Sequence, residues 1–370
     1  MNRAVQYRTL GRTGYKVSQL GFGAMRLPMA GDKVDRALAI PMIHRAFEAG
    51  LNYIDSAVGY CNGDSQRAVG EALKGWREKI VVSTKNPYYG EDEKEWWTNL
   101  ENSLERLQVD SIDVYNTHGV NWKAYTESVE PRVGKWMLKA KSQGLIKHIC
   151  TSFHDSNDAL RKIVDTGFYE SVTLQYNLLD RQLEDAIAYA HQKGMGVTVM
   201  GPVGGGRLGA DTEALKGILP PGVGRVPELA LRFVLSNPDI SVALSGMSTM
   251  SQVEENMKTA SEPVALSDEE RKAVAEHLER LSKMVGLYCS GCGYCKPCTS
   301  GVDIPGVFRL YNEARVYGIW EHARGTYSWY QTEKTSADNC TECEKCLEKC
   351  PQKIPIPEKL KEAHKALTAR

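Results

Sequence analysis

The fold is decided by a stretch near the start of the chain, NYIDSAVGY at residues 52–60, followed by SQRAVGEALKGWR at residues 65–77. The first part opens with a short β-rich run, 52–55, that ends in a polar residue, and the second part has helical character. We therefore expect a strand, a loop and a helix here. The same order recurs along the chain, and the predicted strands are 17–23, 52–55, 80–84, 112–117, 148–152, 172–175, 197–200 and 241–244.

Helical stretches lie between and after these strands, at about 36–49, 65–77, 93–107, 128–143, 157–166, 182–193, 227–236 and 251–258. Eight such units over about 250 residues predict a parallel sheet closed into a (β/α)8 barrel. An open doubly wound sheet is the alternative. It is weakened because Gly21-Phe22-Gly23 lacks the later glycine of a dinucleotide fingerprint, and no acidic residue follows at the usual distance. We also expect a hairpin over 6–16 and a helix over 267–284, opened by a capping box at 267–270.

The composition is that of a globular protein without a strong charge bias. The 370 residues include 46 basic and 46 acidic side chains, with 42% hydrophobic and 25% charged residues. A net charge of zero argues against binding to nucleic acid or to an anionic membrane surface. No apolar run approaches the roughly 20 residues of a membrane span. The first residues lack the apolar core of a secretory signal, so we expect a cytoplasmic protein.

Ten cysteines are unusual in such a chain, because disulfides are rare in reducing compartments. Only Cys61 and Cys150 lie before residue 289. The other eight form two runs: Cys289, Cys292, Cys295, Cys298, and Cys340, Cys343, Cys346, Cys350. The second run, C-x2-C-x2-C-x3-C-P, has the spacing with which bacterial ferredoxins hold 4Fe–4S clusters.

The two runs predict two 4Fe–4S clusters, with two structural zinc sites as the alternative. In two-cluster ferredoxins the last cysteine of each run ligates the other cluster. By that logic Cys350 completes the first run's set, and Cys298 completes the second run's set. The sequence then divides into a barrel domain over 1–284 and a small, mainly helical ferredoxin-like domain over 285–370.

A barrel of this kind places its chemistry at the carboxyl ends of its strands. Asp55, Lys85 and His118 follow or end three successive predicted strands, and Tyr60 lies on the loop just after Asp55. Four polar groups that converge in this way are a candidate active site. The alternative is an ion pair of Asp55 and Lys85 with a purely structural role at the barrel rim.

These residues carry a resemblance to a known family. The stretch 52–60 with Ser65 and the segment 69–73, together with the segments 82–85 and 113–118, resembles the aldo-keto reductases over roughly residues 5–260. The cysteine-rich extension resembles the branch of that family with a C-terminal ferredoxin-like domain. Tyr60 would then be the acid that protonates a carbonyl oxygen. Lys85, held by Asp55, would lower its pKa, and His118 would bind the substrate oxygen.

The resemblance also implies a nicotinamide cofactor. Ser152 and Gln175 would bind the carboxamide, and the turn with Gly201 and Gly204 would wrap the pyrophosphate. Ser248, Gln252 and Asn256 match the end of the cofactor groove, where relatives that use NADP usually carry Lys or Arg. The chain has only hydroxyls and an amide there, so the cofactor is left open between NADP and NAD. The structural alternative is that these three residues cap the following helix.

The expected function is reduction of a carbonyl, or oxidation of an alcohol, with NAD(P)H as hydride donor and the clusters linking the barrel to one-electron transfer. The substrate would be a small molecule, and the redox partner a ferredoxin or a flavoprotein. One alternative is a reductase driven by its clusters, with little or no use of nicotinamide. Another is an electron-transfer protein whose barrel has lost turnover.

Overall fold

A computed structural model describes residues 5–209, 211–262, 266–283, 289, 293, 295–350 and 353–369. Contacts divide the chain into two compact units, Met1–Gly205 with Glu228–Leu266 and Gly206–Pro227 with Ser267–Arg370. The predicted boundary between residues 284 and 285 lies outside the described residues, and that domain assignment stays a prediction. Among the described residues no helix is long and apolar enough to cross a membrane.

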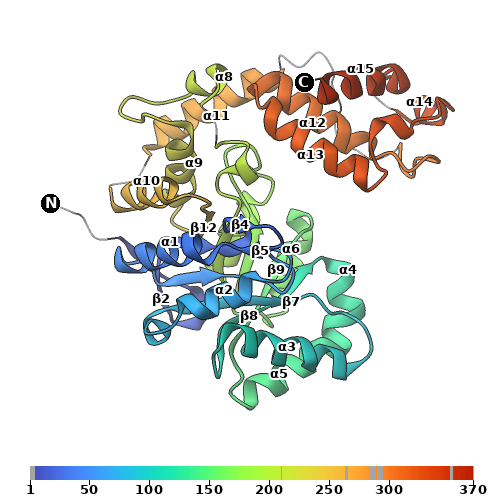
Figure 1. Cartoon of the computed structure of the whole chain (residues 1–370). Helices are drawn as coiled ribbons and strands as arrows, with labels where there is room; N and C mark the ends of the chain where they lie inside the picture. Colours follow the sequence, from blue (N-terminus) through green and yellow to red (C-terminus); the bar gives the residue numbers. More distant parts are fainter. Residues whose placement is uncertain are drawn as a thin grey trace. The chain divides into compact units, whose positions relative to one another are not determined.

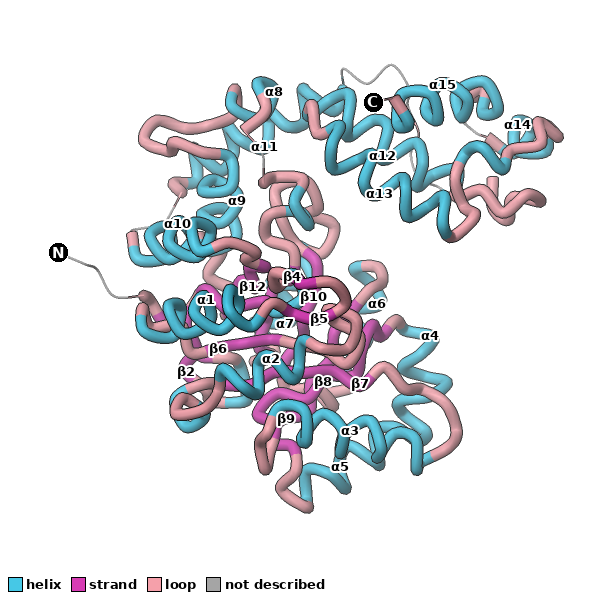
Figure 2. Tube along the Cα trace, in the orientation of Figure 1, coloured by secondary structure: helices cyan, strands magenta, loops and turns pink. Residues whose placement is uncertain are grey.

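Eight parallel strands close into a barrel in the first unit, in the order β10-β11-β12-β3-β6-β7-β8-β9 (Figures 1 and 2). The barrel predicted from the sequence is thereby confirmed. Its strands are β3 (Leu20–Gly23), β6 (Tyr53–Asp55), β7 (Val81–Asn86), β8 (Ile112–Val120), β9 (Ile146–Phe153), β10 (Ser171–Gln175), β11 (Gly196–Met200) and β12 (Val242–Gly246).

Helices follow the strands around the outside of the barrel, as Figure 2 shows. They are α1 (Arg36–Glu48), α2 (Ser65–Ala72), α3 (Glu93–Leu107), α4 (Trp122–Ala124), α5 (Gly134–Ser142), α6 (Asn157–Asp165), α7 (Glu184–Gln192), α9 (Val226–Leu235) and α10 (Met250–Ser261). A π-helical segment, Tyr125–Val133, joins α4 to α5. The prediction of a helix over 128–143 was therefore wrong at its start, because Asn121 already caps a helix there by accepting from the N–H of Ala124 at 2.7 Å.

The expected hairpin consists of β1 (Tyr7–Thr9) and β2 (Lys16–Ser18), and a second small hairpin joins β4 (Met29–Ala30) and β5 (Lys33–Val34). Leu10 and Val17 of the first hairpin pack with residues at the starts of the barrel strands, including Tyr53, Val81 and Val114. The first hairpin therefore closes the amino-terminal end of the barrel, leaving its carboxyl end for the site.

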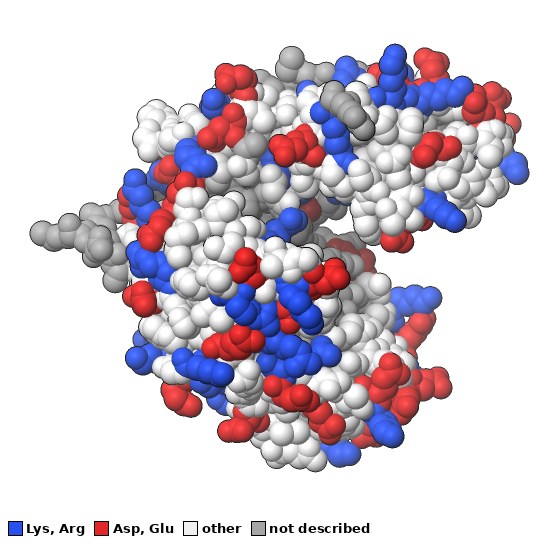
Figure 3. All heavy atoms as spheres, viewed as in Figure 1, with Lys and Arg blue, Asp and Glu red and all other residues white. Residues whose placement is uncertain are grey.

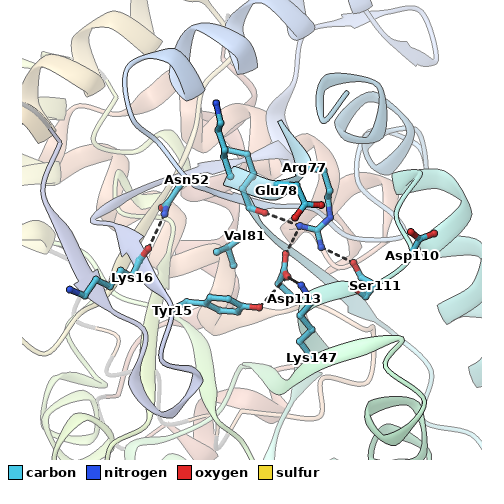
Figure 4. A pocket seen from close by; sticks show the side chains of 12 residues that line it. Tyr15, Lys16, Asn52, Arg77, Glu78, Val81, Asp110, Ser111, Asp113 and Lys147 are labelled. Atoms are coloured by element: carbon cyan, nitrogen blue, oxygen red, sulfur yellow. Dashed lines mark hydrogen bonds and ion pairs between the residues drawn. The ribbon is translucent and has the colours of Figure 1, made fainter. Parts of the chain in front are cut away.

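A polar pocket of about 320 Å³ lies at the same amino-terminal end (Figure 4). Its centre is Asp113 at the start of β8, which is 2% exposed. Asp113 accepts from the backbone N–H of Val82 at 2.8 Å and from Lys147 Nζ at 2.8 Å. Arg77 Nη1 lies 2.9 Å from Asp113 Oδ2, and the Tyr15 hydroxyl donates to Asp113 Oδ1 at 3.2 Å. One carboxylate thus ties together β7, β8, β9 and the hairpin.

In the described part of the second unit, all regular elements are helical. They are α8 (Glu213–Lys216), α11 (Asp268–Lys283), α12 (Ile304–Tyr317), α13 (Trp320–Thr332), α14 (Lys345–Lys349) and α15 (Ile356–Thr368), with a 3-10 turn at Ala337–Asn339. The capping box of α11 is confirmed: Glu270 N–H donates to Ser267 Oγ at 3.1 Å, and Ser267 N–H donates to Glu270 Oε2 at 2.8 Å. Helices α12, α13 and α15 pack on one apolar core.

Charged side chains of both signs intermingle on the surface of each unit in the view of Figure 3. This agrees with the equal numbers of basic and acidic residues in the sequence.

Candidate functional site

The four residues predicted to form the active site come from three neighbouring strands of the barrel. Asp55 is the last residue of β6, Lys85 lies near the end of β7, and His118 lies near the end of β8. Tyr60 lies in the turn after β6, where its backbone oxygen accepts from Gly63 N–H and Ser65 N–H. The structure therefore brings these four side chains to the carboxyl end of the barrel, as expected for this fold.

Lys85 and Asp55 form an ion pair in the barrel interior, and both are almost fully buried. Lys85 Nζ also donates to the backbone oxygen of Ser56 at 2.9 Å, while Ser83 Oγ donates to Asp55 Oδ2 at 2.7 Å. Burial alone would lower the pKa of Lys85, but Asp55 and Tyr60 raise it above its usual value. Lys85 therefore carries a positive charge in a fixed position.

Tyr60 lies against this charge, with Lys85 Nζ 4.9 Å from the centre of its ring. The next two residues, Cys61 and Asn62, have φ angles of 51° and 55°. That left-handed backbone is uncommon outside glycine and turns the chain sharply after Tyr60. The Tyr60 ring also meets the His118 ring edge-on, with 6.2 Å between centroids and 84° between planes.

The pKa of Tyr60 differs from the sequence-based expectation. Burial raises the pKa of Tyr60, and although Lys85 acts in the opposite direction by charge and hydrogen bond, the pKa stays above its usual value. Lys85 thus lowers the pKa of Tyr60, as expected, but desolvation of the phenol raises this pKa by more. Tyr60 is protonated at neutral pH and can act as a proton donor.

His118 is uncharged at neutral pH. Burial, the nearby Lys85 and the neighbouring His154 together lower the pKa of His118 to about 4. The backbone oxygen of His118 accepts from the Tyr89 hydroxyl at 3.0 Å. The imidazole is therefore a neutral hydrogen-bonding group beside Tyr60 and not a second cation.

Ser152 and Gln175, predicted to bind a nicotinamide carboxamide, lie at the ends of β9 and β10. Ser152 Oγ accepts from the N–H of Gly119 at 2.8 Å. Gly201, directly after β11, has a φ of +64°, and a Cβ there would lie only 2.9 Å from Gln175 Oε1. The absence of a side chain at Gly201 leaves room for the Gln175 amide, and the binding of a carboxamide by Ser152 and Gln175 stays a prediction.

The turn predicted to wrap the pyrophosphate continues through Gly204 and Gly205, with φ angles of 60° and 66°. Sequence reasoning missed a residue here, Arg26, which follows β3. Its Nη2 donates to the backbone oxygen of Gly205 at 3.1 Å, and its side chain lies against Gly246 at the end of β12. The order of the strands would have pointed to Arg26, because β3 pairs with β12 in the closed barrel.

The loop after β12 engages its polar groups within the protein. Ser248 Oγ donates to the backbone oxygen of Arg26 at 2.7 Å, and Gln252 Oε1 accepts from Ser248 N–H at 2.7 Å. Thr249 caps α10 by accepting from Gln252 N–H at 3.3 Å. Asn256 Nδ2 donates to Ser245 Oγ at 3.0 Å. The residue that caps α10 is thus Thr249, and the Ser248 hydroxyl and the Gln252 amide oxygen bond to other backbone groups beside it. The cofactor role of Ser248, Gln252 and Asn256 stays a prediction.

A small cavity of about 50 Å³ in the second unit is lined in part by cysteines. Five of them line it: Cys295, Cys298, Cys340, Cys343 and Cys346. They come from the two separate runs, so the fold brings the runs together. Cysteine is the residue type that binds an iron–sulfur cluster or zinc through sulfur, but among the described residues no group of three such side chains is placed to hold a metal ion. Cys295 and Cys298 of the first run both lie beside the second run, so the lining does not separate the two predicted ligand sets, which stay a prediction.

Cys350 has a different place in this unit. It is buried in the apolar core of α12, α13 and α15, and Cys289 and Cys295 pack against the same core. Cys292 lies outside the described residues. Cys298, Cys340 and Cys346 pack against this core as well, so the grouping does not distinguish the two runs, and the pairing of Cys350 with the first run stays a prediction.

Comparison with known proteins identifies both units. A model described as the aldo/keto reductase family matches residues 19–218, more than half of the chain. The chain belongs to this family. A model described as a 4Fe-4S dicluster domain matches residues 288–354. The protein is thus an oxidoreductase of the aldo-keto reductase type with a C-terminal 4Fe–4S domain, as the sequence predicted.

Relatives of this aldo-keto reductase match the barrel. L-galactose dehydrogenase of Arabidopsis thaliana is 28% identical over 77% of this chain and 98% of its own length. The NADH-specific methylglyoxal reductase of Escherichia coli is 27% identical over 74% of this chain and 98% of its own length. A solved aldo-keto reductase from Bacillus halodurans, in its holo form, is 28% identical with a TM-score of 0.64 over 74% of this chain and 96% of its own.

Proposed function

We propose that this protein reduces the carbonyl group of a small molecule, or oxidises the corresponding alcohol, with Tyr60 as the acid and base. The observation that carries the proposal is the buried Lys85–Asp55 ion pair against the ring of a protonated Tyr60. In reduction the Tyr60 hydroxyl donates its proton to the carbonyl oxygen, and the positive charge of Lys85 stabilises the phenolate that remains. Neutral His118 orients the same oxygen by a hydrogen bond.

NAD(P)H, when bound, supplies the hydride. Ser152 and Gln175 would hold its carboxamide, and the backbone of the turn at Gly201 and Gly204 would approach its pyrophosphate. Arg26 adds a positive charge beside that turn. The name of the Escherichia coli relative supports NADH as a donor in this family. A 2′-phosphate would find no positive charge at Ser248, Gln252 or Asn256. Activity with NADH and activity with NADPH are therefore to be compared directly.

The C-terminal domain would hold two 4Fe–4S clusters, which pass electrons one at a time. Cys289, Cys292 and Cys295 with Cys350 form one proposed ligand set. Cys340, Cys343 and Cys346 with Cys298 form the other. A ferredoxin or a flavoprotein is the proposed redox partner. We place the protein in the cytoplasm, where reducing conditions keep cysteines free for metal ligation, and cell fractionation tests this location.

Replacement of Tyr60 by Phe tests the proposal, because it removes only the hydroxyl. We expect kcat with a carbonyl substrate and NADH or NADPH to fall by roughly 100-fold or more, the usual contribution of a positioned acid. Nucleotide affinity, measured by quenching of protein fluorescence, is expected to stay the same. Tyr7→Phe is the matched control, since that exposed hydroxyl donates to the Gly50 backbone oxygen in a different part of the barrel. Full activity in Tyr60→Phe would refute the acid role.

The loop after β12 favours a second candidate, a reductase driven by its clusters with little use of nicotinamide. Its side chains at Ser248 and Gln252 already bind within the protein. This candidate predicts no heat of binding for NADH or NADPH in calorimetry, but turnover with reduced ferredoxin or a reduced viologen dye. Turnover that depends on NADH or NADPH excludes it.

A further inference from the structure

The segment that follows the glycine turn after β11 belongs to the same compact unit as the C-terminal helices. Residues 206–227 form this unit with residues from 267 onward. The glycine turn at 201–205 is the proposed pyrophosphate site, and Gly206 continues directly from it. Residues 206–227 are thus connected to that turn by the backbone.

A buried ion pair attaches this segment to α12. Arg207 Nη1 lies 2.7 Å from Glu313 Oε1, and the two side chains are only 10% and 15% exposed. In the sequence, Arg207 follows the last residue of the glycine turn, Gly205, by two positions. A buried ion pair has a defined geometry, and losing one partner leaves the other charge buried and uncompensated.

A second attachment lies at the end of α12. Thr212 Oγ1 donates to the backbone oxygen of Tyr317, the last residue of α12, at 2.6 Å. Such carbonyls at a helix end lack a partner within the helix. Thr212 also caps α8 by accepting from Leu215 N–H at 3.3 Å. The segment is therefore tied to α12 at two points by different kinds of bond.

Helix α12 in turn belongs to the core that carries the cysteines. Val307, Phe308 and Ala314 of α12 pack in one cluster with Cys350, and other cysteines of both runs pack against it. Metal binding to such a site contributes directly to the stability of the surrounding fold. The position of Glu313 and Tyr317 thus depends on the same core as the cluster ligands.

We propose that Arg207–Glu313 and Thr212–Tyr317 couple the iron–sulfur domain to nucleotide binding. The inference rests on the proposed nucleotide site after β11 and assigns Arg207 and Thr212 as positioning residues for it. An intact cluster domain holds the glycine turn in the form that binds nucleotide. Because such coupling is reciprocal, bound nucleotide also protects the clusters from loss.

The test uses the holoprotein purified without oxygen. We expect Arg207→Met and Thr212→Val each to raise the Kd for NADH or NADPH by roughly five-fold or more, within the usual range of coupling between sites. Saturating nucleotide is expected to slow the release of iron to a chelator in the wild type but not in Arg207→Met. The double variant R207E/E313R restores the opposite charges and is expected to recover part of the affinity.

Arg45→Gln is the control, because Arg45 forms an exposed ion pair with Glu254. Iron content shows whether each variant is assembled, and Thr212→Val carries the test if Arg207→Met loses iron. Unchanged Kd and unchanged protection in Thr212→Val and Arg207→Met would overturn the inference and leave the proposed function standing. A wild type that binds neither nucleotide would overturn both.

Discussion

Burial acts on Tyr60 and His118 in ways that leave both side chains uncharged at neutral pH. It raises the pKa of the Tyr60 phenol and lowers the pKa of the His118 imidazole. Lys85 is charged between them because Asp55 compensates for its burial. One fixed cation beside two neutral hydrogen-bonding groups is an arrangement in which a proton can leave Tyr60 and the resulting negative charge is stabilised.

The pKa of His118 leads to a prediction about pH. Burial, Lys85 and His154 lower this pKa to about 4, so His118 does not change its charge between pH 5.5 and 8. We expect kcat/KM to show no inflection near pH 6.5, the usual pKa of histidine. His118→Gln is expected to have lower activity but the same pH profile over this range.

The measurement is steady-state kinetics of both proteins at saturating nucleotide across that pH range. Because the pKa is lower in the folded state than in the unfolded chain, His118 also lowers stability only as the pH falls below about 6.5. An inflection near pH 6.5 that disappears in His118→Gln would contradict the neutral imidazole.

For single residues, the sequence predicted which side chains of the site come together, but not all of their pKa values and neighbours. The order of strand ends was enough to bring Asp55, Lys85 and His118 to one end of the barrel. The pKa of Tyr60 was not predictable, because desolvation depends on the packing around the ring. Arg26 was missed because its neighbour Gly205 is 179 residues away in the chain.

The elements were predicted well where a local signal marks their ends. Ser267 and Glu270 form the expected capping box at α11, and all eight barrel strands lie within a few residues of their predicted positions. The helical stretch after β8 was less predictable. Its π-helical part contains Pro131, which has no N–H to donate and disturbs the regular helical pattern.

The amino-terminal ends of the strands depend on Asp113. Burial would raise its pKa, but hydrogen bonds from Lys147, Val82 N–H and Arg77 together lower it. Asp113→Asn keeps the shape but leaves the partly buried Arg77 without its countercharge. We expect a loss of about 3 kcal/mol in unfolding free energy at pH 7, typical of a broken buried ion pair. Denaturant unfolding followed by near-UV circular dichroism measures it.

The sign of the pH dependence follows from the lowered pKa. A carboxyl group whose pKa is lower when folded stabilises the protein above its unfolded pKa of about 3.9, and this stabilisation is lost as the pH falls through the folded value. The difference between wild type and Asp113→Asn should therefore be constant from pH 7 to 5. Asp110→Asn is the control, an exposed carboxyl that lines the same pocket. Equal losses in both variants would contradict a specific role of Asp113.

On the scale of the whole molecule, the distribution of cysteines separates the two units. Cys61 and Cys150 lie in the barrel, where Cys150 is buried in the strand core. The cysteines after residue 288 surround the cavity and the core of the helical unit in its described part. The sequence spacing indicated metal ligation but left iron–sulfur clusters and zinc as alternatives, because both are bound by grouped thiolates.

The match to a 4Fe-4S dicluster domain favours the clusters, and metal analysis of the protein purified without oxygen tests their number. Two 4Fe–4S clusters predict about eight irons and about eight sulfides per chain, with a broad brown absorbance that dithionite bleaches. Cys298→Ser and Cys350→Ser remove one ligand from each proposed set. Each is expected to lower the iron content toward about four per chain if the sets are independent. Cys61→Ser is the control, since Cys61 lies in the barrel beside Tyr60 and is expected to leave the iron content unchanged. About two zinc ions per chain without sulfide would contradict the clusters. That result would also remove the one-electron step from the proposed function. The role of Tyr60 would still be tested separately by Tyr60→Phe.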